Sequence, residues 1–320
     1  MTENMVHSIP PKPWQPLRPG DIVDVIAPGY GAGAEHLKKA ADFIASLGLV
    51  ARIPEDLIRP HLFCSNSDAE RLRHTQAALY AKDSKAVWCL KGGYGTAALI
   101  PELMKHRAPT RAKLLMGFSD ITALHLLLAQ RWGWTTLHAP VLWQITAEKI
   151  SQDSIERLTR VIFGKAREVE YTLEPLPSRS SPTTDHRPPT TVTGGNMAIL
   201  QTGIGTKWHP NTAGKIFFIE EVDEKPYRVS RMFTHFRQAG LFDAPTAVIL
   251  GDFTIEEAEQ EAMETMLQDF ASTCAFPVFR LHGIGHEATN YPLPINSPTR
   301  IITGKRITLT CDTGVAEQGS

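Results

Sequence analysis

Short apolar runs alternate with helix-like stretches through the first half of the chain. The expected strands span residues 21–27, 49–53, 86–90 and 112–116. The expected helices span residues 34–47, 69–80 and 120–130, where apolar residues recur at helical spacing. Strands that alternate with helices predict a parallel sheet with helices on both faces.

The pattern changes at a Pro-rich stretch, residues 175–191, whose composition resists regular structure. Beyond it, strands are expected at 216–220, 247–250 and 278–281, with a hairpin of 300–302 and 307–310 that turns through 303–305. The chain is therefore predicted to consist of an α/β domain (1–174), a linker (175–191) and a mixed domain with more antiparallel character (192–320).

Composition narrows the class of protein. The 320 residues are 42% hydrophobic and 21% charged, with a formal net charge of -1 and a pI near 6.9. This is ordinary for two globular domains, and no basic excess indicates nucleic-acid binding. No apolar run approaches the roughly 18 residues of a membrane helix, and the N-terminus lacks the pattern of a signal peptide. Scattered cysteines predict free thiols and a cytoplasmic location.

A glycine-rich turn, Gly29–Ala34, follows the first expected strand and fits the outline of a dinucleotide-binding loop, with Asp56 some twenty residues further on. Pro28 stands where the first glycine would normally leave the strand. The simpler interpretation, a turn that only starts a helix, is favoured. A nicotinamide-dependent oxidoreductase stays open as a remote alternative.

Two other motifs are imperfect. His286–Asn290 (HEATN) lacks the second histidine of the zinc motif H-E-x-x-H, and the glycines before it favour a loop, so no metal site is predicted. Lys91–Gly95 (KGGYG) resembles a phosphate loop only loosely, because no G-K-[ST] follows.

Ser119 stands in the segment GFSD, directly between an apolar strand and a helix. Such a turn presents a hydroxyl at the carboxyl edge of a sheet, beside the positive end of a helix. Taken alone, helix capping by Ser119 or Asp120 explains the segment at least as well.

A serine nucleophile needs a base and an acceptor that orients the base. His286 lies in a glycine-flanked loop after an apolar strand, where surface exposure is the ordinary alternative. Glu220 ends the apolar run 216–219, and a carboxylate there needs a partner to offset its desolvation. Glu221 is adjacent, and periodicity does not choose between the two.

Taken together, these segments resemble the bacterial L,D-carboxypeptidases, the serine peptidases that include muramoyl-tetrapeptide carboxypeptidases and microcin-C self-immunity hydrolases. The resemblance runs from about Gly20 to about Pro294. The segments that carry it, in family order, are KGGYG (91–95), GFSDITALH (117–125), GGN (194–196), EEV (220–222), PYR (226–228), RM (231–232), AGLF (239–242), GH (285–286) and PLP (292–294).

The resemblance implies Ser119 as nucleophile, His286 as base and Glu220 as its partner. It also implies a flavodoxin-like nucleophile domain joined to a smaller, swivelling β-rich α+β domain that carries the glutamate and the histidine. No cofactor is implied. The backbone N–H groups of Gly93 and Asp120 are the candidate oxyanion hole.

The implied reaction releases a C-terminal D-Ala from a cytoplasmic murein tetrapeptide during cell-wall recycling. The implied enzyme is a homodimer, and its substrate is a small peptide with a free carboxylate. Candidate substrate-binding residues are Gly92, Tyr94, Asn196, Arg228 and Arg231. Each has a structural alternative: helix capping for Asn196, core packing for Tyr94 and pairing with nearby acids for the arginines.

Several positions depart from the family pattern. Lys91 replaces an arginine, and 137–140 (LHAP), 287–288 (EA) and Asn296 replace glycine-containing segments. These differences leave the substrate open. A hydrolase of peptidyl-nucleotides is the nearest alternative, and a non-catalytic binding protein of the same fold is another.

Overall fold

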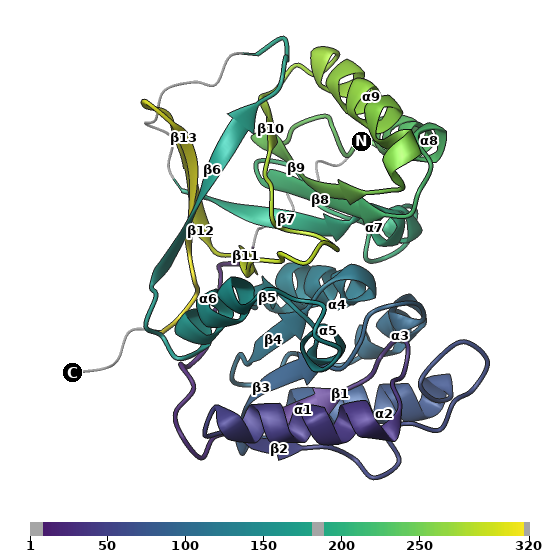
Figure 1. Ribbon diagram of the computed structural model, residues 1–320, viewed down its shortest axis with the longest axis vertical. Coiled ribbons are helices and arrows are strands. Elements are labelled where there is room, and N and C mark those ends of the chain that lie inside the picture. The colour runs from purple at the N-terminus through teal and green to yellow at the C-terminus, as the bar shows by residue number, and fades with distance from the viewer. Residues whose placement is uncertain (1–8, 181–188, 317–320) are drawn as a thin grey trace.

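The computed structural model describes residues 9–180 and 189–316, which form a sheet half and a barrel half (Figure 1). The sheet half is the lower one in Figure 1, and its sheet has the strand order β11-β5-β4-β3-β1-β2. These strands are β1 (Ile22–Ile26), β2 (Val50–Arg52), β3 (Ser84–Cys89), β4 (Leu114–Gly117), β5 (Thr136–His138) and β11 (Leu293–Ile295). Strands β1 to β5 are parallel, in the order 2-1-3-4-5 of flavodoxin-like sheets, which confirms the predicted parallel sheet.

Helices cover both faces of this sheet. They are α1 (Ala34–Ser46), α2 (Asp68–Tyr80), α3 (Thr96–Leu103), α4 (Thr122–Leu127), α5 (Leu142–Thr146) and α6 (Gln152–Ile162). Along β3, Ala86 and Trp88 pack with the core on the α1 and α6 side, whereas Val87 and Cys89 join the core on the α2 to α4 side. Because both faces are buried, the strand is apolar throughout rather than alternating.

The barrel half closes through seven strands in the order β10-β6-β13-β12-β7-β8-β9. They are β6 (Glu168–Pro175), β7 (Thr190–Asn196), β8 (Ile216–Val222), β9 (Ala247–Thr254), β10 (Val278–Arg280), β12 (Pro298–Ile302) and β13 (Ile307–Asp312). Strands β7 to β10 are parallel and the remaining pairs antiparallel, so the mixed character and the hairpin β12–β13 are confirmed. Closure into a barrel was not predicted, because it depends on β6 pairing with strands more than 100 residues further along the chain.

Three helices pack outside the barrel: α7 (Met197–Gly203), α8 (Pro226–Gln238) and α9 (Gln260–Ser272). Strand β8 separates two cores. Ile216 and Phe218 face the barrel interior, whereas Phe217 and Ile219 face the helices. That helix-side core is continuous with the α2 to α4 side of the sheet half, so one hydrophobic core joins the two halves.

The chain passes between the halves more than once. Strand β6 precedes the Pro-rich stretch yet belongs to the barrel, and β11 returns from the barrel to pair with β5 in the sheet. The domain limits 1–174, 175–191 and 192–320 stay a prediction, and residues 181–188 lie outside the described part. The four cysteines are free, and three of them are buried. Within residues 9–180 and 189–316, no helix combines the length and hydropathy of a membrane span.

Candidate active site

Ser119 lies on a sharp turn between β4 and α4. Phe118 is extended, and Ser119 then adopts φ +64° at the start of a 3-10 turn, Ser119–Ile121. This left-handed conformation costs a residue with a Cβ about 1–3 kcal/mol and is typical of strained functional turns. The cap positions belong to Phe118 and Ile121, and no side chain caps there, so helix capping by Ser119 or Asp120 is wrong.

Asp120 holds the turn that contains Ser119 in place through its side chain. Its side chain is 1% exposed, and its Oδ2 accepts hydrogen bonds from Thr96 N–H at 2.9 Å and from Thr96 Oγ1 at 2.6 Å. Burial raises the pKa of this carboxyl, although the bonds from Thr96 oppose the rise. The side chain thereby ties the serine turn to the first residue of α3.

The turn after β3 lies directly against Ser119. A Cβ on Gly92 would come within 3.0 Å of Ser119 Cβ and 3.2 Å of its Oγ, so only glycine fits without displacing the serine. Gly93 follows with φ +100° and is exposed. Neither the N–H of Gly93 nor that of Asp120 donates a hydrogen bond to another described residue.

Glu220 and His286 meet from two separate segments of the barrel half. Glu220, at the end of β8, is fully buried, and its Oε2 lies 2.8 Å from Nδ1 of His286. The histidine is carried by the loop after β10, where Gly283 N–H donates to Asp252 and Asp252 N–H donates to the carbonyl of Ile284. The loop therefore has a defined conformation, and the segment 286–290 forms no helix.

Charge coupling dominates the electrostatics of this pair. Burial alone would raise the pKa of Glu220, but the charge of His286, the nearby imidazole of His138 and the hydrogen bond of His286 hold that pKa below its ordinary value. For His286, burial works to lower the pKa, and the Glu220 carboxylate outweighs it and raises the pKa above the usual histidine value. The pair therefore favours a carboxylate beside an imidazole with increased proton affinity.

Phe118 connects the turn of Ser119 with the imidazole of His286. Its ring lies 4.7 Å, centroid to centroid, from the imidazole of His286, and it directly precedes Ser119. No hydrogen bond joins Ser119 Oγ to His286 in the described part of the chain, and the Nε2 of His286 has no hydrogen-bond partner there. Nucleophile and base are often separated before substrate binds, so this arrangement is compatible with catalysis.

The GGN segment holds the two halves together beside the serine turn. Asn196 N–H donates to Thr122 Oγ1 at 3.0 Å, and a Cβ on Gly195 would come within 2.4 Å of that oxygen. The Asn196 side chain accepts from Ile199 N–H, which makes it the N-cap of α7, and its Nδ2 donates to Glu221. The capping interpretation of Asn196 is thus confirmed.

The other candidate substrate-binding residues are more exposed. Tyr94 is 60% exposed, so core packing is wrong for it. Arg228 pairs with Glu224 at 3.4 Å, and the Arg231 guanidinium lies 5.7 Å from the centre of the Tyr227 ring. This pairing is the structural alternative expected for Arg228.

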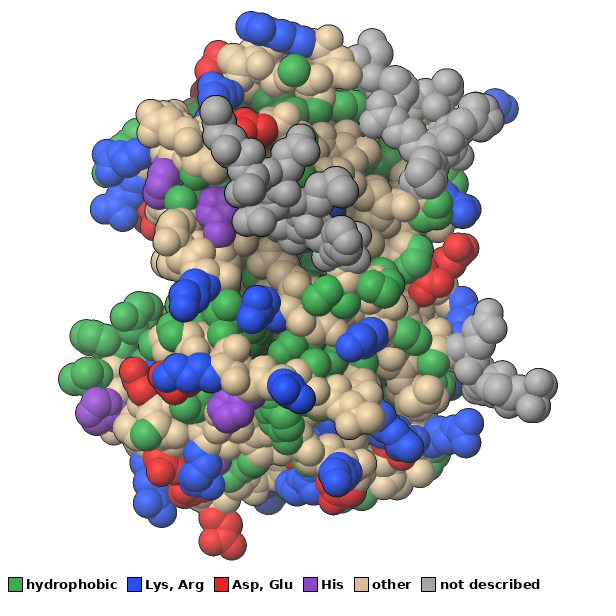
Figure 2. All heavy atoms as spheres, turned by 180° about the vertical axis from the view of Figure 1, so that it is seen from behind, with side chains coloured by type: hydrophobic (Ala, Val, Ile, Leu, Met, Phe, Trp, Pro, Cys, Tyr) green, Lys and Arg blue, Asp and Glu red, His purple; other side chains and the backbone are tan. Residues whose placement is uncertain are grey.

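Lys91 occupies the position of the family arginine. Its Nζ lies 4.2 Å from the centre of the Trp143 ring, and that of Lys149 lies 5.0 Å from the same ring. Neither lysine forms a salt bridge with a described acid. Lys and Arg side chains gather along and below the waist between the two halves (Figure 2).

His138 is a further residue of the site, which the sequence pattern does not single out. It ends β5, is fully buried, and has its Nε2 3.9 Å from Oε1 of Glu220. The available signal was a histidine at the carboxyl end of an apolar strand, next to the strand that leads to Ser119. Its relation to Glu220 depends on how the two halves pack, which the pattern does not show.

The turn 29–34 packs against the serine turn and against the turn after β3. A Cβ on Gly29 would lie 2.5 Å from Asp120 Oδ2, and Tyr30 N–H donates to the carbonyl of Gly92. A carboxylate at this turn would repel a pyrophosphate. These contacts favour the simpler interpretation of a turn that starts a helix, and they show in addition that the turn packs against the serine site.

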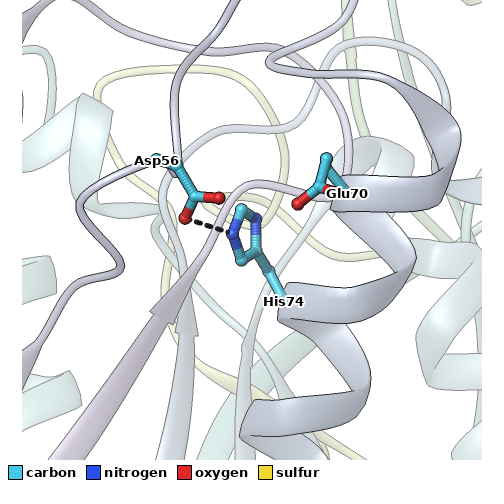
Figure 3. A group of neighbouring side chains, drawn as sticks. All are labelled: Asp56, Glu70 and His74. Carbon is cyan, nitrogen blue, oxygen red and sulfur yellow. Dashed lines mark hydrogen bonds and ion pairs between the residues drawn. The ribbon is translucent and has the colours of Figure 1, made fainter.

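Asp56 belongs to a group with Glu70 and His74 whose ligand atoms lie within 4.8 Å of one another (Figure 3). The dashed line in Figure 3 is the 2.9 Å contact of His74 Nε2 with Asp56 Oδ1. The Arg73 guanidinium donates hydrogen bonds to the carboxylates of Asp56 and Glu70, and its Nη2 lies 2.9 Å from Nε2 of His74. The guanidinium therefore supplies the positive charge that a metal ion would bring.

Comparison with known proteins places the chain in a family. Residues 23–139 match the model of the LD-carboxypeptidase N-terminal domain, and residues 190–301 match that of the C-terminal domain. A Rickettsia conorii protein provisionally named a carboxypeptidase is 37% identical over 90% of each chain. The murein tetrapeptide carboxypeptidase of Pseudomonas aeruginosa is 26% identical over 92% of this chain and 96% of its own.

Solved structures agree with this fold. The muramoyltetrapeptide carboxypeptidase of Oxalobacter formigenes is 26% identical, with a TM-score of 0.74, over 91% of this chain and 98% of its own. The microcin C7 self-immunity protein MccF, at 19% identity, superposes with a TM-score of 0.79 over 96% of this chain and all of its own. The chain therefore belongs to the LD-carboxypeptidase family and is a serine-type L,D-carboxypeptidase.

Proposed function

We propose that Ser119 is the nucleophile of this enzyme, that His286 is its general base and that Glu220 orients the imidazole. One observation carries the assignment. Glu220 Oε2 binds Nδ1 of His286 at 2.8 Å, which directs the basic Nε2 away from the carboxylate, and the strained Ser119 lies one residue from the Phe118 ring that contacts this imidazole.

The chemistry follows from these positions. Nε2 of His286 takes the proton of Ser119 Oγ as that oxygen attacks the carbonyl carbon of the scissile L,D-peptide bond. The imidazolium then donates the proton to the leaving amine, and an acyl-enzyme on Ser119 remains. A water molecule, deprotonated by His286, attacks the acyl carbon, and the imidazolium then gives its proton to Ser119 Oγ as the bond between that oxygen and the acyl carbon breaks. Glu220 holds one tautomer and stabilises the imidazolium throughout.

The backbone N–H groups of Gly93 and Asp120 are proposed to bind the oxyanion. Both lie on turns that contact or contain Ser119, and neither is engaged by a described residue. Losing one such donor costs roughly 3–4 kcal/mol of transition-state stabilisation. Gly92 would keep the surface beside Ser119 open, and Tyr94 would contact the substrate from the exposed side.

The proposed substrate is a murein tetrapeptide that loses its C-terminal D-Ala in the cytoplasm, during cell-wall recycling. The names of the Pseudomonas and Oxalobacter relatives support this substrate class. Arg228, Arg231 and Lys91 are the candidate cations for the free carboxylate of the peptide. We further propose a homodimer, and a swivelling motion of the barrel half relative to the sheet half during turnover.

The test is incubation of the purified protein with a murein tetrapeptide ending in D-Ala, followed by mass spectrometry, beside a Ser119→Ala variant of equal thermal stability. Loss of one D-Ala with wild type alone is the expected result. If neither protein releases D-Ala, the murein assignment is wrong. A peptidyl-nucleotide amide is then the second substrate, and its cleavage by wild type alone would reassign the substrate while retaining Ser119.

A further inference from the structure

Two polar groups face each other in the buried junction without a hydrogen bond. His138 and Glu220 are both 0% exposed, and their closest atoms, His138 Nε2 and Glu220 Oε1, are 3.9 Å apart. Among the described residues, neither ring nitrogen of His138 has a hydrogen-bond partner, and neither does Oε1 of Glu220. A buried polar group without a partner costs about 1–3 kcal/mol, so two of them side by side need an explanation.

The surroundings of His138 leave Glu220 as its partner. The rings of Phe118 and Phe218 each lie 5.4 Å from the imidazole, centroid to centroid, and both are apolar. The imidazole of His125 is stacked at 6.4 Å, but its two nitrogens are engaged by Thr136 Oγ1 and by the carbonyl of Gly117. Among the described residues, Glu220 is the carboxylate within ion-pair distance of His138.

We propose that His138 is a positioning residue for the reaction: its Nε2–H donates to Oε1 of Glu220, so that the carboxylate is held between the imidazoles of His138 and His286. The inference rests on the proposed roles of Ser119, Glu220 and His286. His138 Nε2 and Glu220 Oε1 need to approach each other by about 1 Å to reach an ordinary N–H···O distance. Rotation of either side chain, or closer approach of β5 and β8, supplies that shift.

The second imidazole has a definite electrostatic effect. With both oxygens engaged, Glu220 cannot rotate away from His286, and its negative charge is partly satisfied before any proton arrives. A donor to a buried carboxylate stabilises the form without the extra proton more than the protonated form. Removing the donor therefore raises the proton affinity of the Glu220–His286 pair, whichever of the two binds the proton.

The test compares two substitutions of similar length, His138→Gln, which retains an N–H donor, and His138→Met, which does not. For His138→Met we expect kcat/KM on the D-Ala tetrapeptide to fall about 10- to 100-fold, as for loss of one hydrogen bond to a charged group. The acidic limb of its pH profile moves upward by about one unit. His138→Gln restores most of the rate and returns the limb toward its wild-type position.

Equal losses in both variants without a shift of the acidic limb would mean that His138 only fills space, and the proposal would be wrong. No loss in His138→Met would also overturn it. Thermal unfolding of both variants identifies any that fails to fold, and such a variant is excluded from the kinetic comparison.

A measurement on the wild-type protein needs neither activity nor the Met variant. In a protein labelled with 15N histidine, the signals absent from His138→Gln identify the nitrogens of His138. An Nε2 shift typical of a protonated ring nitrogen supports the proposal, and one typical of an unprotonated nitrogen contradicts it. Because this readout does not depend on substrate, it separates failure of the inference from failure of the proposed function.

Discussion

Glu220 and Glu221 are adjacent in β8 but bind on opposite sides of the strand. Glu220 reaches Nδ1 of His286 at 2.8 Å, whereas Glu221 accepts from Asn196 Nδ2 at 2.8 Å and from Ala198 N–H at 2.7 Å. The alternation of side chains along a strand separates them. One carboxylate is thereby available to the proposed base, while the other anchors the start of α7.

The two glutamates make a matched pair for testing catalysis. Glu220→Gln removes the charge that stabilises the imidazolium and allows the wrong tautomer of His286, so we expect kcat to fall by about 10³–10⁴-fold. Glu221→Gln should change kcat by no more than a few-fold. Steady-state kinetics on the D-Ala tetrapeptide measures both, and equal losses in the two variants would contradict the assignment of Glu220.

Glu221 should make stability depend on pH. Burial, with a contribution from the Glu220 charge, raises the pKa of Glu221 to about 7, so the folded protein holds a proton that the unfolded chain releases near 4.5. Stability contributed by this group is therefore present below about pH 4.5 and is lost as pH rises toward 7. The difference corresponds to about 3 kcal/mol.

Urea unfolding of wild type and Glu221→Gln at pH 5 and pH 8 measures this effect. The wild type is expected to lose more stability between the two values than the variant does. His286 is common to both proteins, and Glu221 contributes less than Glu220 to its raised pKa, so most of the difference between the two proteins comes from Glu221. Parallel pH dependences would show that Glu221 keeps an ordinary pKa.

Ser119 combines the proposed chemistry with backbone strain, and two substitutions separate these properties. Ser119→Ala and Ser119→Gly both remove the hydroxyl, and each should lower kcat by about 10⁴-fold or more. Glycine tolerates φ +64° without the Cβ penalty, so Ser119→Gly should be more stable than Ser119→Ala, by about 1 kcal/mol. Thermal unfolding decides the second point, and a more stable alanine variant would argue against strain at this turn.

Gly92 is predicted to matter for rate rather than for stability. A methyl group in Gly92→Ala would come within 3.2 Å of Ser119 Oγ and displace the hydroxyl, so kcat should fall by about tenfold or more. Gly33→Ala is the control, because a Cβ at Gly33 meets no atom within 4 Å. If Gly92→Ala retains the wild-type kcat, the contact with Ser119 does not constrain the nucleophile.

Substitution of Lys91 tests whether the sheet half binds the carboxylate of the substrate. The Lys91 ammonium forms no salt bridge with a described acid, so a substrate carboxylate would be its first anionic partner. Lys91→Met should raise KM about tenfold with a smaller change in kcat, whereas Lys91→Arg should retain binding. An unchanged KM in Lys91→Met would leave Arg228→Met and Arg231→Met as the substitutions that identify the anchor.

The parallel sheet was predictable from local pattern, because each strand and each helix carries its own periodicity. The element from 120 to 130 shows the limit. Its apolar spacing predicts one helix, but the structure has a 3-10 turn, α4 and a π-helical turn (Leu128–Trp132) in succession. Hydrogen-bond register within a helix depends on how its ends are held, and here Ser119 begins in a left-handed conformation that no periodicity records.

The sequence by itself determined the alternation of strands and helices and the turn that presents Ser119. Through the family resemblance it also indicated Ser119, Glu220 and His286 as the candidate catalytic residues. Periodicity left Glu220 and Glu221 unresolved and gave His138 no role. Only the tertiary structure separated the two glutamates, closed the barrel with β6, and brought His138 of β5 within 3.9 Å of Glu220 in β8. The physical reason is distance along the chain. Periodicity reports which face a residue buries, whereas these relations depend on pairings and packing between segments from 25 to more than 130 residues apart.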